Sequence, residues 1–224
     1  RAILAGTFPP GSHLPTVRDL ARDHSVNPST IQRALARLER RGLVTARQGS
    51  GLLVNDPAEV GDVTLLADWL AVTAHDPERA AGILADVLDL RRVLAARLLA
   101  RHRLAVLDAL AALVAGAAEL VAVPAHEVWR ADLEFARTVI RATGNTVAAA
   151  LFNSMARALA ELPEVRAAMY ADPSSNAASM VAILGLLQEG GADLADRIEA
   201  AMAEVDERTV SRFRHVLAAE VAPS

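Results

Sequence analysis

The stretch that decides the fold is residues 16–54, which read TVRDLARDHSVNPSTIQRALARLERRGLVTARQGSGLLV. Its first residue, Thr16, is followed three positions later by Asp19, a spacing that fits a capping box. This pattern predicts a short helix that begins after Thr16 and ends near His24. A tight turn at residues 25–26 separates this helix from the N-cap residue of the next helix.

The second helix is marked at both of its ends. Asn27 is a favourable N-cap residue, and Pro28 suits the first helical position. The helix is expected to run to Arg41, because Gly42 then ends it. Its apolar residues recur at helical spacing and predict the face that packs on the core; they are Ile31, Leu35 and Leu38.

Two short strand candidates follow, residues 43–47 and 51–54, joined by a turn at residues 48–50. The order helix, helix, hairpin within 60 residues is that of a winged helix-turn-helix. Residues 1–54 also carry eight arginines against three acidic residues, whereas the rest of the chain carries 15 arginines against 24 acidic residues. A basic head on an acidic body indicates a head that binds a polyanion, and the alternative on charge alone is a solvated charged face.

Composition excludes several classes of protein. The 224 residues are 53% hydrophobic, so a core can form and disorder is excluded. There is no cysteine, which excludes disulfides and thiolate metal sites and suits the cytoplasm. There is also no lysine, which excludes Schiff-base chemistry. No apolar run predicts a membrane span, and no catalytic constellation stands out, so we expect a cytoplasmic protein that is not an enzyme.

The remainder of the chain is predicted to be helical. Residues 55–61 are polar, with a proline and a glycine, and are interpreted as a linker. Turn signals divide residues 62–224 into about seven helices. We therefore predict a mainly α fold, in which a winged helix-turn-helix at residues 1–54 precedes an all-α bundle. The turn signals lie at residues 75–77, 123–124, 143–145, 163, 172–175 and 190–191.

The first turn of the second helix carries side chains that can read DNA. In a helix-turn-helix this helix enters the major groove. Glutamine can bond adenine, and arginine can bond guanine or a phosphate. We expect contacts from Asn27, Ser29, Thr30, Gln32 and Arg33, with further positive charge from Arg18, Arg22, Arg37 and Arg47.

Residues 3–54 resemble the head of the GntR family of bacterial transcription regulators. The resemblance is carried by Pro10-Gly-Ser-His-Leu-Pro-Thr-Val-Arg-Asp-Leu-Ala21 and by Asn27-Pro-Ser-Thr-Ile-Gln-Arg-Ala-Leu-Ala-Arg-Leu-Glu-Arg-Arg-Gly-Leu-Val44. Arginines that read bases in the FadR-like subfamily fall on Pro28 and Gln32, and the wing histidine falls on Gln48. A different operator is therefore expected. The DNA contacts that the resemblance implies are Arg18, Ser29, Thr30, Gln32, Gln48 and Gly49.

Two charged residues interrupt apolar stripes in the body. Arg91 lies among Leu84, Val87, Leu88, Leu94, Ala95 and Leu98, and Asp132 lies among Trp129, Leu133, Ala136 and Val139. A buried charge without a partner is strongly unfavourable, so each residue needs one. Either the two pair with each other in the core, or they face a cavity that holds an anionic effector, or the faces are assigned wrongly.

Residues 78–215 resemble the helical effector domain of the FadR-like subfamily. Asp132-Leu-Glu-Phe-Ala-Arg-Thr-Val-Ile-Arg-Ala-Thr-Gly-Asn145 matches its Asp-x-x-Phe-His … Ser-Gly-Asn signature. Many members bind a metal through this aspartate and three histidines. Those histidine positions fall on Ala136, Met180 and Val205, so we expect no metal and no cofactor.

Without the metal ligands, the chain resembles the acyl-CoA-responsive members of the subfamily, whose effector domain is metal-free. The effector-binding residues that the resemblance implies, the former metal positions included, are Arg91, Asp132, Asn153, Met180, Val205, Thr209 and Phe213. Another effector position falls on Asp206, whose charge would repel a CoA phosphate. We expect a homodimeric repressor that binds a palindromic operator in double-stranded DNA and responds to a fatty acid or acyl-CoA. The alternatives are a regulator that responds to a small organic acid and a constitutive DNA binder.

Overall fold

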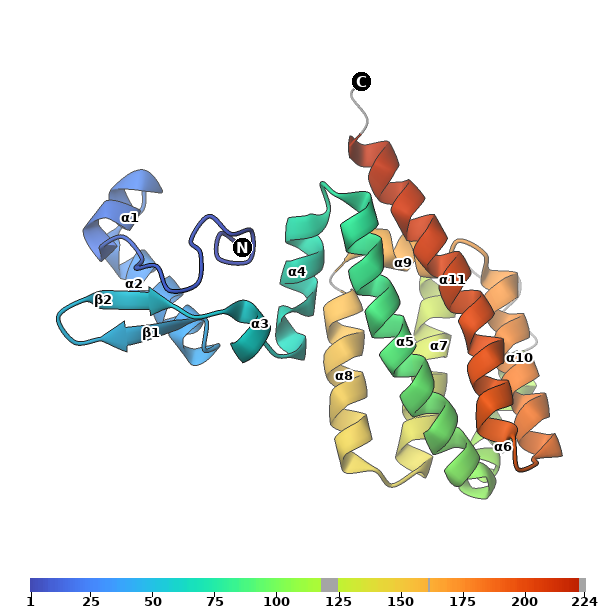
Figure 1. Cartoon of the computed structure of the whole chain (residues 1–224). Coiled ribbons are helices and arrows are strands. Elements are labelled where there is room, and N and C mark those ends of the chain that lie inside the picture. Colours follow the sequence, from blue (N-terminus) through green and yellow to red (C-terminus); the bar gives the residue numbers. More distant parts are fainter. Residues whose placement is uncertain (118–124, 161, 222–224) are drawn as a thin grey trace. The chain divides into compact units, whose positions relative to one another are not determined.

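The computed structural model describes residues 1–117, 125–160 and 162–221, and the chain divides into two compact units, Arg1–Val72 and Thr73–Ser224 (Figure 1). The mainly α fold with a small two-stranded wing is confirmed. Helix α3 (Pro57–Val60) lies within the stretch predicted as a linker, and it belongs to the first unit. The predicted boundaries at residues 1–54, 55–61 and 62–224 stay predictions.

The two helices of the head begin at the predicted caps. Helix α1 (Val17–Asp23) starts after Thr16, whose hydroxyl oxygen accepts from the backbone N–H of Asp19 at 3.2 Å. Helix α2 (Pro28–Arg40) starts after Asn27, whose Oδ1 accepts from the backbone N–H of Thr30 at 3.0 Å. Each cap satisfies an N–H that the helix itself leaves without an acceptor.

The turn between α1 and α2 holds the helices against one small core. Ser25 adopts φ 53°, in the left-handed region that side chains other than glycine rarely occupy. The backbone N–H of Val26 then returns to the carbonyl of Ala21 at 3.0 Å. This turn brings together the buried faces of both helices, which consist of Leu20, Ala21, Ile31 and Leu35.

The wing is an antiparallel hairpin of β1 (Val44–Arg47) and β2 (Gly51–Val54). Val44 pairs with Val54 at its base, where both side chains are almost fully buried. The segment before α1 runs alongside β2, because the Ser12 carbonyl accepts from the N–H of Val54 at 2.8 Å. The base of the wing is therefore fixed to the head, while the rest of β1 and the tip are exposed.

The first unit continues through α3, a 3₁₀ turn (Val63–Leu65) and α4 (Leu66–Thr73). Arg41, the C-cap of α2, ties the end of α2 to this segment. Its guanidinium donates to the Asp68 carboxylate at 2.9 Å and to the Thr64 carbonyl at 2.8 Å.

The second unit is a bundle of seven α-helices in the described residues. They are α5 (Pro77–Arg101), α6 (Arg103–Ala117), α7 (Ala125–Ala142), α8 (Thr146–Ala160), α9 (Pro163–Met169), α10 (Pro173–Glu189) and α11 (Leu194–Val221). With α4, the part of residues 62–221 that the structure describes holds eight α-helices. The sequence predicted about seven helices there, because the break between α5 and α6, at His102, carries no proline or glycine that would signal it.

The break at His102 is fixed by a tertiary contact. Arg103, the first residue of α6, donates from its guanidinium to the backbone carbonyls of Leu187 and Gln188. Both carbonyls lie in the last turn of α10, where carbonyl groups have no partner within their own helix. A contact between residues more than 80 positions apart has no signal in the local sequence.

The bundle has an apolar core, and part of that core borders an internal cavity. Helix α11 packs along α5 and also contacts α9 and α10 (Figure 1). The core between α5, α6, α7, α10 and α11 is apolar and includes Ala96, Leu99, Val106, Leu110, Val139, Ile183, Leu187, Leu194 and Ile198. Among the described residues, no helix is long and apolar enough to cross a membrane.

Candidate DNA interface and effector cavity

The N-terminal turn of α2 presents the side chains that were predicted to contact DNA. Ile31 and Leu35 face the core, and Gln32 and Arg33 between them are exposed. Asn27 and Ser29 are also exposed, and Thr30 is half-buried. The structure therefore places all the predicted residues of α2 at one end of one helix.

Asn27 organises the small polar groups at this end. Its Oδ1 accepts from the hydroxyl of Ser29 at 2.6 Å and from the hydroxyl of Thr30 at 3.0 Å. Each hydroxyl has one proton, so in this arrangement both oxygens offer only lone pairs to a ligand. Such acceptors suit the amino groups of adenine or cytosine in the major groove.

The arginines of the head fall into two groups. Arg22 is bound by Asp19 at 3.0 Å and Asp23 at 3.2 Å, and Arg41 is bound by Asp68. Within the described part of the head, six exposed arginines have no ion pair and remain free to contact phosphates. They are Arg1, Arg18, Arg33, Arg37, Arg40 and Arg47.

The tip of the wing carries the remaining predicted contacts. Gln48 and Gly49 are both exposed and join β1 to β2. Gly49 has φ 79°, a conformation that a glycine adopts without strain.

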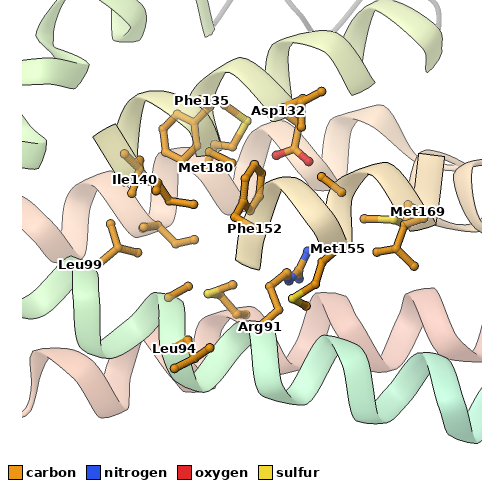
Figure 2. Close-up of a pocket in the computed structure, with 18 of the residues that line it drawn as sticks. Arg91, Leu94, Leu99, Asp132, Phe135, Ile140, Phe152, Met155, Met169 and Met180 are labelled. Atoms are coloured by element: carbon orange, nitrogen blue, oxygen red, sulfur yellow. The ribbon is translucent and has the colours of Figure 1, made fainter. Parts of the chain in front are cut away.

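A cavity of about 390 Å³ lies inside the bundle and is lined by residues from α5, α7, α8, α9, α10 and α11 (Figure 2). This volume falls in the range of small-molecule sites, roughly 300–1,000 Å³. All four methionines of the chain line it: Met155, Met169, Met180 and Met202. Methionine is flexible and polarisable, so this lining can adapt to an irregular or flexible apolar ligand.

The structure brings five of the seven predicted effector residues to this cavity, namely Arg91, Asp132, Met180, Val205 and Thr209. Asn153 lies instead at a smaller pocket between α7 and α8, beside Arg137 and Arg141. Phe213 is buried and does not line the cavity. Sequence reasoning missed Tyr170 and the other three methionines, although the restriction of methionine to residues 155–202 was a usable signal.

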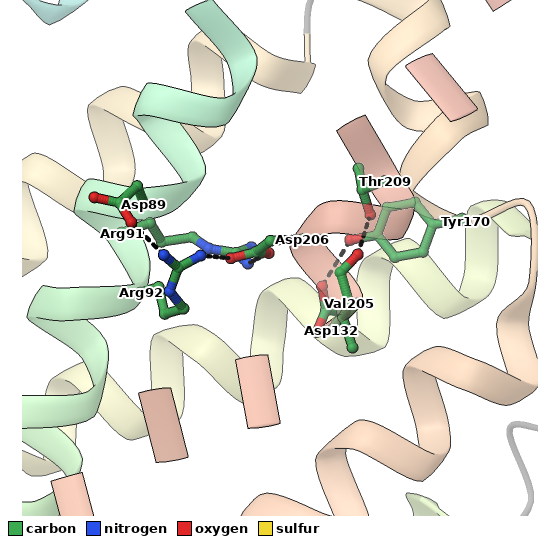
Figure 3. Close-up of polar contacts among 8 residues, drawn as sticks. All are labelled: Asp89, Arg91, Arg92, Asp132, Tyr170, Val205, Asp206 and Thr209. Atoms are coloured by element: carbon green, nitrogen blue, oxygen red, sulfur yellow. Dashed lines mark hydrogen bonds and ion pairs between the residues drawn. The ribbon is translucent and has the colours of Figure 1, made fainter. Parts of the chain in front are cut away.

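Arg91 and Asp132 do not pair with each other. Arg91 comes from α5 and donates to the carboxylate of Asp206 on α11 at 2.5 Å (Figure 3). Arg92 also donates to Asp206, at 3.3 Å, and pairs with Asp89. Burial raises the pKa of Asp206, while the charges of Arg91 and Arg92 oppose that shift.

Asp132 has its own partner in the lining of the cavity. The hydroxyl of Tyr170 donates to the Asp132 carboxylate at 2.7 Å. Burial raises the pKa of Tyr170 well above its ordinary value, and the negative charge of Asp132 adds to the shift. Thr209, also in the lining, donates its hydroxyl to the Val205 carbonyl at 2.9 Å.

The residues at the subfamily's metal-binding positions lie together but lack donors. Ala136, Met180 and Val205 line the same cavity as Asp132. Only Asp132 offers a hard oxygen ligand, and Tyr170 already engages it. Across residues 1–117, 125–160 and 162–221, no three metal-binding side chains gather. This donor set does not fit a divalent cation.

Two protein families match separate parts of this chain. Residues 1–54 match the family described as bacterial regulatory proteins, gntR family, and residues 86–207 match the FCD domain. Among similar curated proteins, an uncharacterized HTH-type transcriptional regulator of Mycobacterium tuberculosis is 31% identical over 216 residues, which are 95% of this chain and 87% of that protein. The families and this relative are regulators, not enzymes.

Further similarities are partial or structural. The fatty acid metabolism regulator protein of Vibrio cholerae is 34% identical over 90 residues, which are 40% of this chain and 31% of that protein. A solved structure of Lar, which controls the Listeria monocytogenes agr system, superposes with a TM-score of 0.48 at 18% identity, over 91% of this chain and 89% of that chain. With a DNA-binding head and a helical effector domain that both match, the chain belongs to the GntR family of bacterial transcription regulators.

Proposed function

We propose that this regulator is a cytoplasmic homodimeric repressor that binds a palindromic operator and is controlled by an amphiphile with an acyl chain. A protein with two-fold symmetry matches the symmetry of a palindrome, since each head reads one half-site. The proposed contacts are the exposed end of α2, the tip of the wing and Arg18 on α1, which lies close to α2 in the head.

The cavity is the observation that supports an acyl effector. Its lining combines all four methionines with Phe135 and Phe152, and it also contains the charged side chains of Arg91, Asp132, Arg166 and Asp206. Burial of an acyl chain there contributes roughly 0.8 kcal/mol per methylene group. A fatty acid metabolism regulator is among the similar proteins, and its name adds support for a ligand of this class.

The two alternatives fit the cavity less well. A small organic acid would leave most of the apolar lining without contacts, and one of the two guanidinium groups in the lining, that of Arg91, is already paired with Asp206. A constitutive DNA binder would have no use for a hollow of this size, because natural cores are close-packed.

DNA recognition is tested by selection of binding sites from random DNA, followed by binding assays with the Gln32→Ala variant. We expect a palindrome to be selected. Gln32→Ala should weaken binding to that palindrome by about 1–3 kcal/mol and should weaken binding to random DNA far less. Equal weakening of both would show that Gln32 does not read a base. Analytical sedimentation of the complex with the operator should give two chains per operator if the protein binds as a dimer.

Effector class is tested by thermal shift with saturated acyl ligands of increasing chain length and with short dicarboxylates. We expect stabilisation that rises with chain length, and we expect operator binding to change at the same ligand concentrations. Replacement of Met180 by Gln, which puts a polar amide in the lining, should weaken the acyl ligands. Stabilisation by the dicarboxylates alone would exclude an acyl effector.

A further inference from the structure

The lining of the cavity contains one arginine that has no anionic partner among the described residues. Of the four charged side chains in the lining, Arg91 and Asp206 form an ion pair with each other. Asp132 accepts a hydrogen bond from the hydroxyl of Tyr170. The fourth, Arg166 on α9, has neither an ion pair nor a side-chain hydrogen bond within the described chain. Its five N–H donors are therefore available to a ligand.

The Arg166 guanidinium is held by an aromatic ring. It lies over Trp129, and its central carbon is 5.9 Å from the centroid of the ring. This distance is within the range of a cation–π interaction. A contact on the face of the guanidinium leaves its N–H groups free, because they lie in the plane. Such a planar group can bind a carboxylate or a phosphate through two parallel hydrogen bonds.

Arg166 lies where the cavity meets the surface, since it is exposed and also belongs to the lining. Met169 follows it by three residues on α9, and Figure 2 shows Met169 at the opposite end of the cavity from Leu99 and Ile140. The lining also includes the apolar side chains of Phe135, Phe152, Met155 and Met180. An amphiphile with its head at Arg166 would keep its charge close to water, which reduces the cost of desolvation, and would place its chain among apolar groups.

We infer that Arg166, positioned by Trp129, binds an anionic head group of the effector, and that the acyl chain extends from there into the cavity. A carboxylate and a phosphate share the required chemistry. Arg91, which the sequence predicted as an effector contact, is engaged by Asp206 and does not bind the head. This inference rests on the proposed acyl effector and adds its orientation and the residue that binds its head.

The test compares decanoate, decyl phosphate and 1-decanol, which share one saturated chain length and differ in the head group. Their affinities are measured by isothermal titration calorimetry. We expect Arg166→Gln to weaken at least one of the two anions about tenfold and 1-decanol by less than about twofold. Arg166→Lys keeps the charge and should bind that anion within about threefold of the wild type. Added salt should weaken that anion in the wild type but not in Arg166→Gln, because an exposed charge is screened.

Two control variants separate this role from a general effect of charge. Arg157 on α8 is exposed, has no ion pair in the described chain and does not line the cavity. Arg157→Gln removes the same charge and should leave all three affinities within about twofold. The double variant Arg91→Gln and Asp206→Asn removes the buried ion pair without a change in net charge, and it should keep the preference for the anion over 1-decanol. Thermal melting of each variant shows whether it folds.

The outcomes distinguish this inference from the proposed function. If none of the three ligands binds the wild type, the acyl effector itself is wrong. If they bind but Arg166→Gln weakens the anions no more than 1-decanol, or no more than Arg157→Gln does, the effector class stands and Arg166 does not bind the head. Loss of the anion preference in the double variant alone would place the head at Arg91. If Arg166→Gln affects only one of the two anions, that anion identifies the head as a carboxylate or a phosphate.

Discussion

The hydroxyl of Tyr170 donates to the Asp132 carboxylate at 2.7 Å and so connects the end of α9 to the middle of α7, with both residues in the lining of the cavity. Tyr170 is the only tyrosine of the chain, and the chain contains neither lysine nor cysteine. Arginine stays charged beyond pH 12, and the other ionisable groups titrate below pH 9. Tyr170 is therefore the one side chain expected to titrate between these limits.

The first prediction concerns stability at alkaline pH. The pKa of Tyr170 is raised in the folded state, first by burial and then by Asp132, whereas in the unfolded state it is about 10. The unfolded chain thus releases the phenol proton first, so stability is retained below pH 10 and is lost as pH rises above it. The melting temperature of the wild type should fall as the pH rises from 10 to 12. The absorbance of tyrosinate should appear only when the protein unfolds.

Two variants check this assignment. Tyr170→Phe should remove the loss of stability above pH 10, but it should cost about 1–3 kcal/mol at neutral pH because Asp132 loses its donor. Asp132→Asn should let Tyr170 titrate at a lower pH. A tyrosinate titration near pH 10 in the folded wild type would contradict the raised pKa.

Local structure was predictable to within a residue or two, and long-range pairing was not. The caps at Thr16 and Asn27 depend on neighbours within three residues, so the sequence carried their signal. The partner of Arg91 is 115 residues away, and the apolar stripe predicted only that Arg91 needs one. The resemblance to the FadR-like subfamily located most of the cavity lining, yet it could not show that Asp206 would face Arg91 rather than a ligand.

The second prediction compares two arginines on α1. Arg18 is exposed and has no ion pair in the described chain, while Arg22, one turn later, is held between Asp19 and Asp23. Removal of one arginine–phosphate interaction reduces the salt dependence of DNA binding by about 0.9 in log–log slope. Arg18→Ala should reduce the slope by about that amount, and Arg22→Ala should change it far less. Equal changes in the two slopes would show that the ion pairs of Arg22 do not keep it from contacting the DNA phosphates.

The third prediction concerns Gly61, which lies in the stretch predicted as a linker. A Cβ atom added there would lie 2.4 Å from the Pro57 carbonyl oxygen and 2.8 Å from the ring of Trp69. Gly61→Ala should therefore destabilise the first unit by about 1–3 kcal/mol. Gly82, in α5, is the matched control, because a Cβ there meets nothing within 4 Å and alanine favours a helix by about 1 kcal/mol. Denaturant melts should give opposite signs for the two variants.

The last prediction concerns the metal-binding positions of the subfamily. Asp132 remains, while the three histidine positions are occupied by Ala136, Met180 and Val205, all in the lining of the same cavity. We expect the wild type to retain no stoichiometric metal after dialysis, since one carboxylate holds a divalent cation weakly. We expect the triple variant Ala136→His, Met180→His and Val205→His to bind about one equivalent of zinc or nickel per chain and to be stabilised by it, because three imidazoles and a carboxylate form a suitable donor set.

The role of Asp132 in that engineered site is checked by two additions to the triple variant. Asp132→Asn should abolish most of the metal binding, and Tyr170→Phe should strengthen it, because the phenol hydroxyl occupies a carboxylate lone pair that the metal would use. Metal content and melting temperature with and without a chelator measure both effects. If the triple variant binds no metal although it folds, the histidine positions have been assigned to the wrong residues. If the wild type holds one equivalent of metal per chain, the prediction that it has no metal site is wrong. The proposal that the cavity binds an acyl chain would then lose one of its supports.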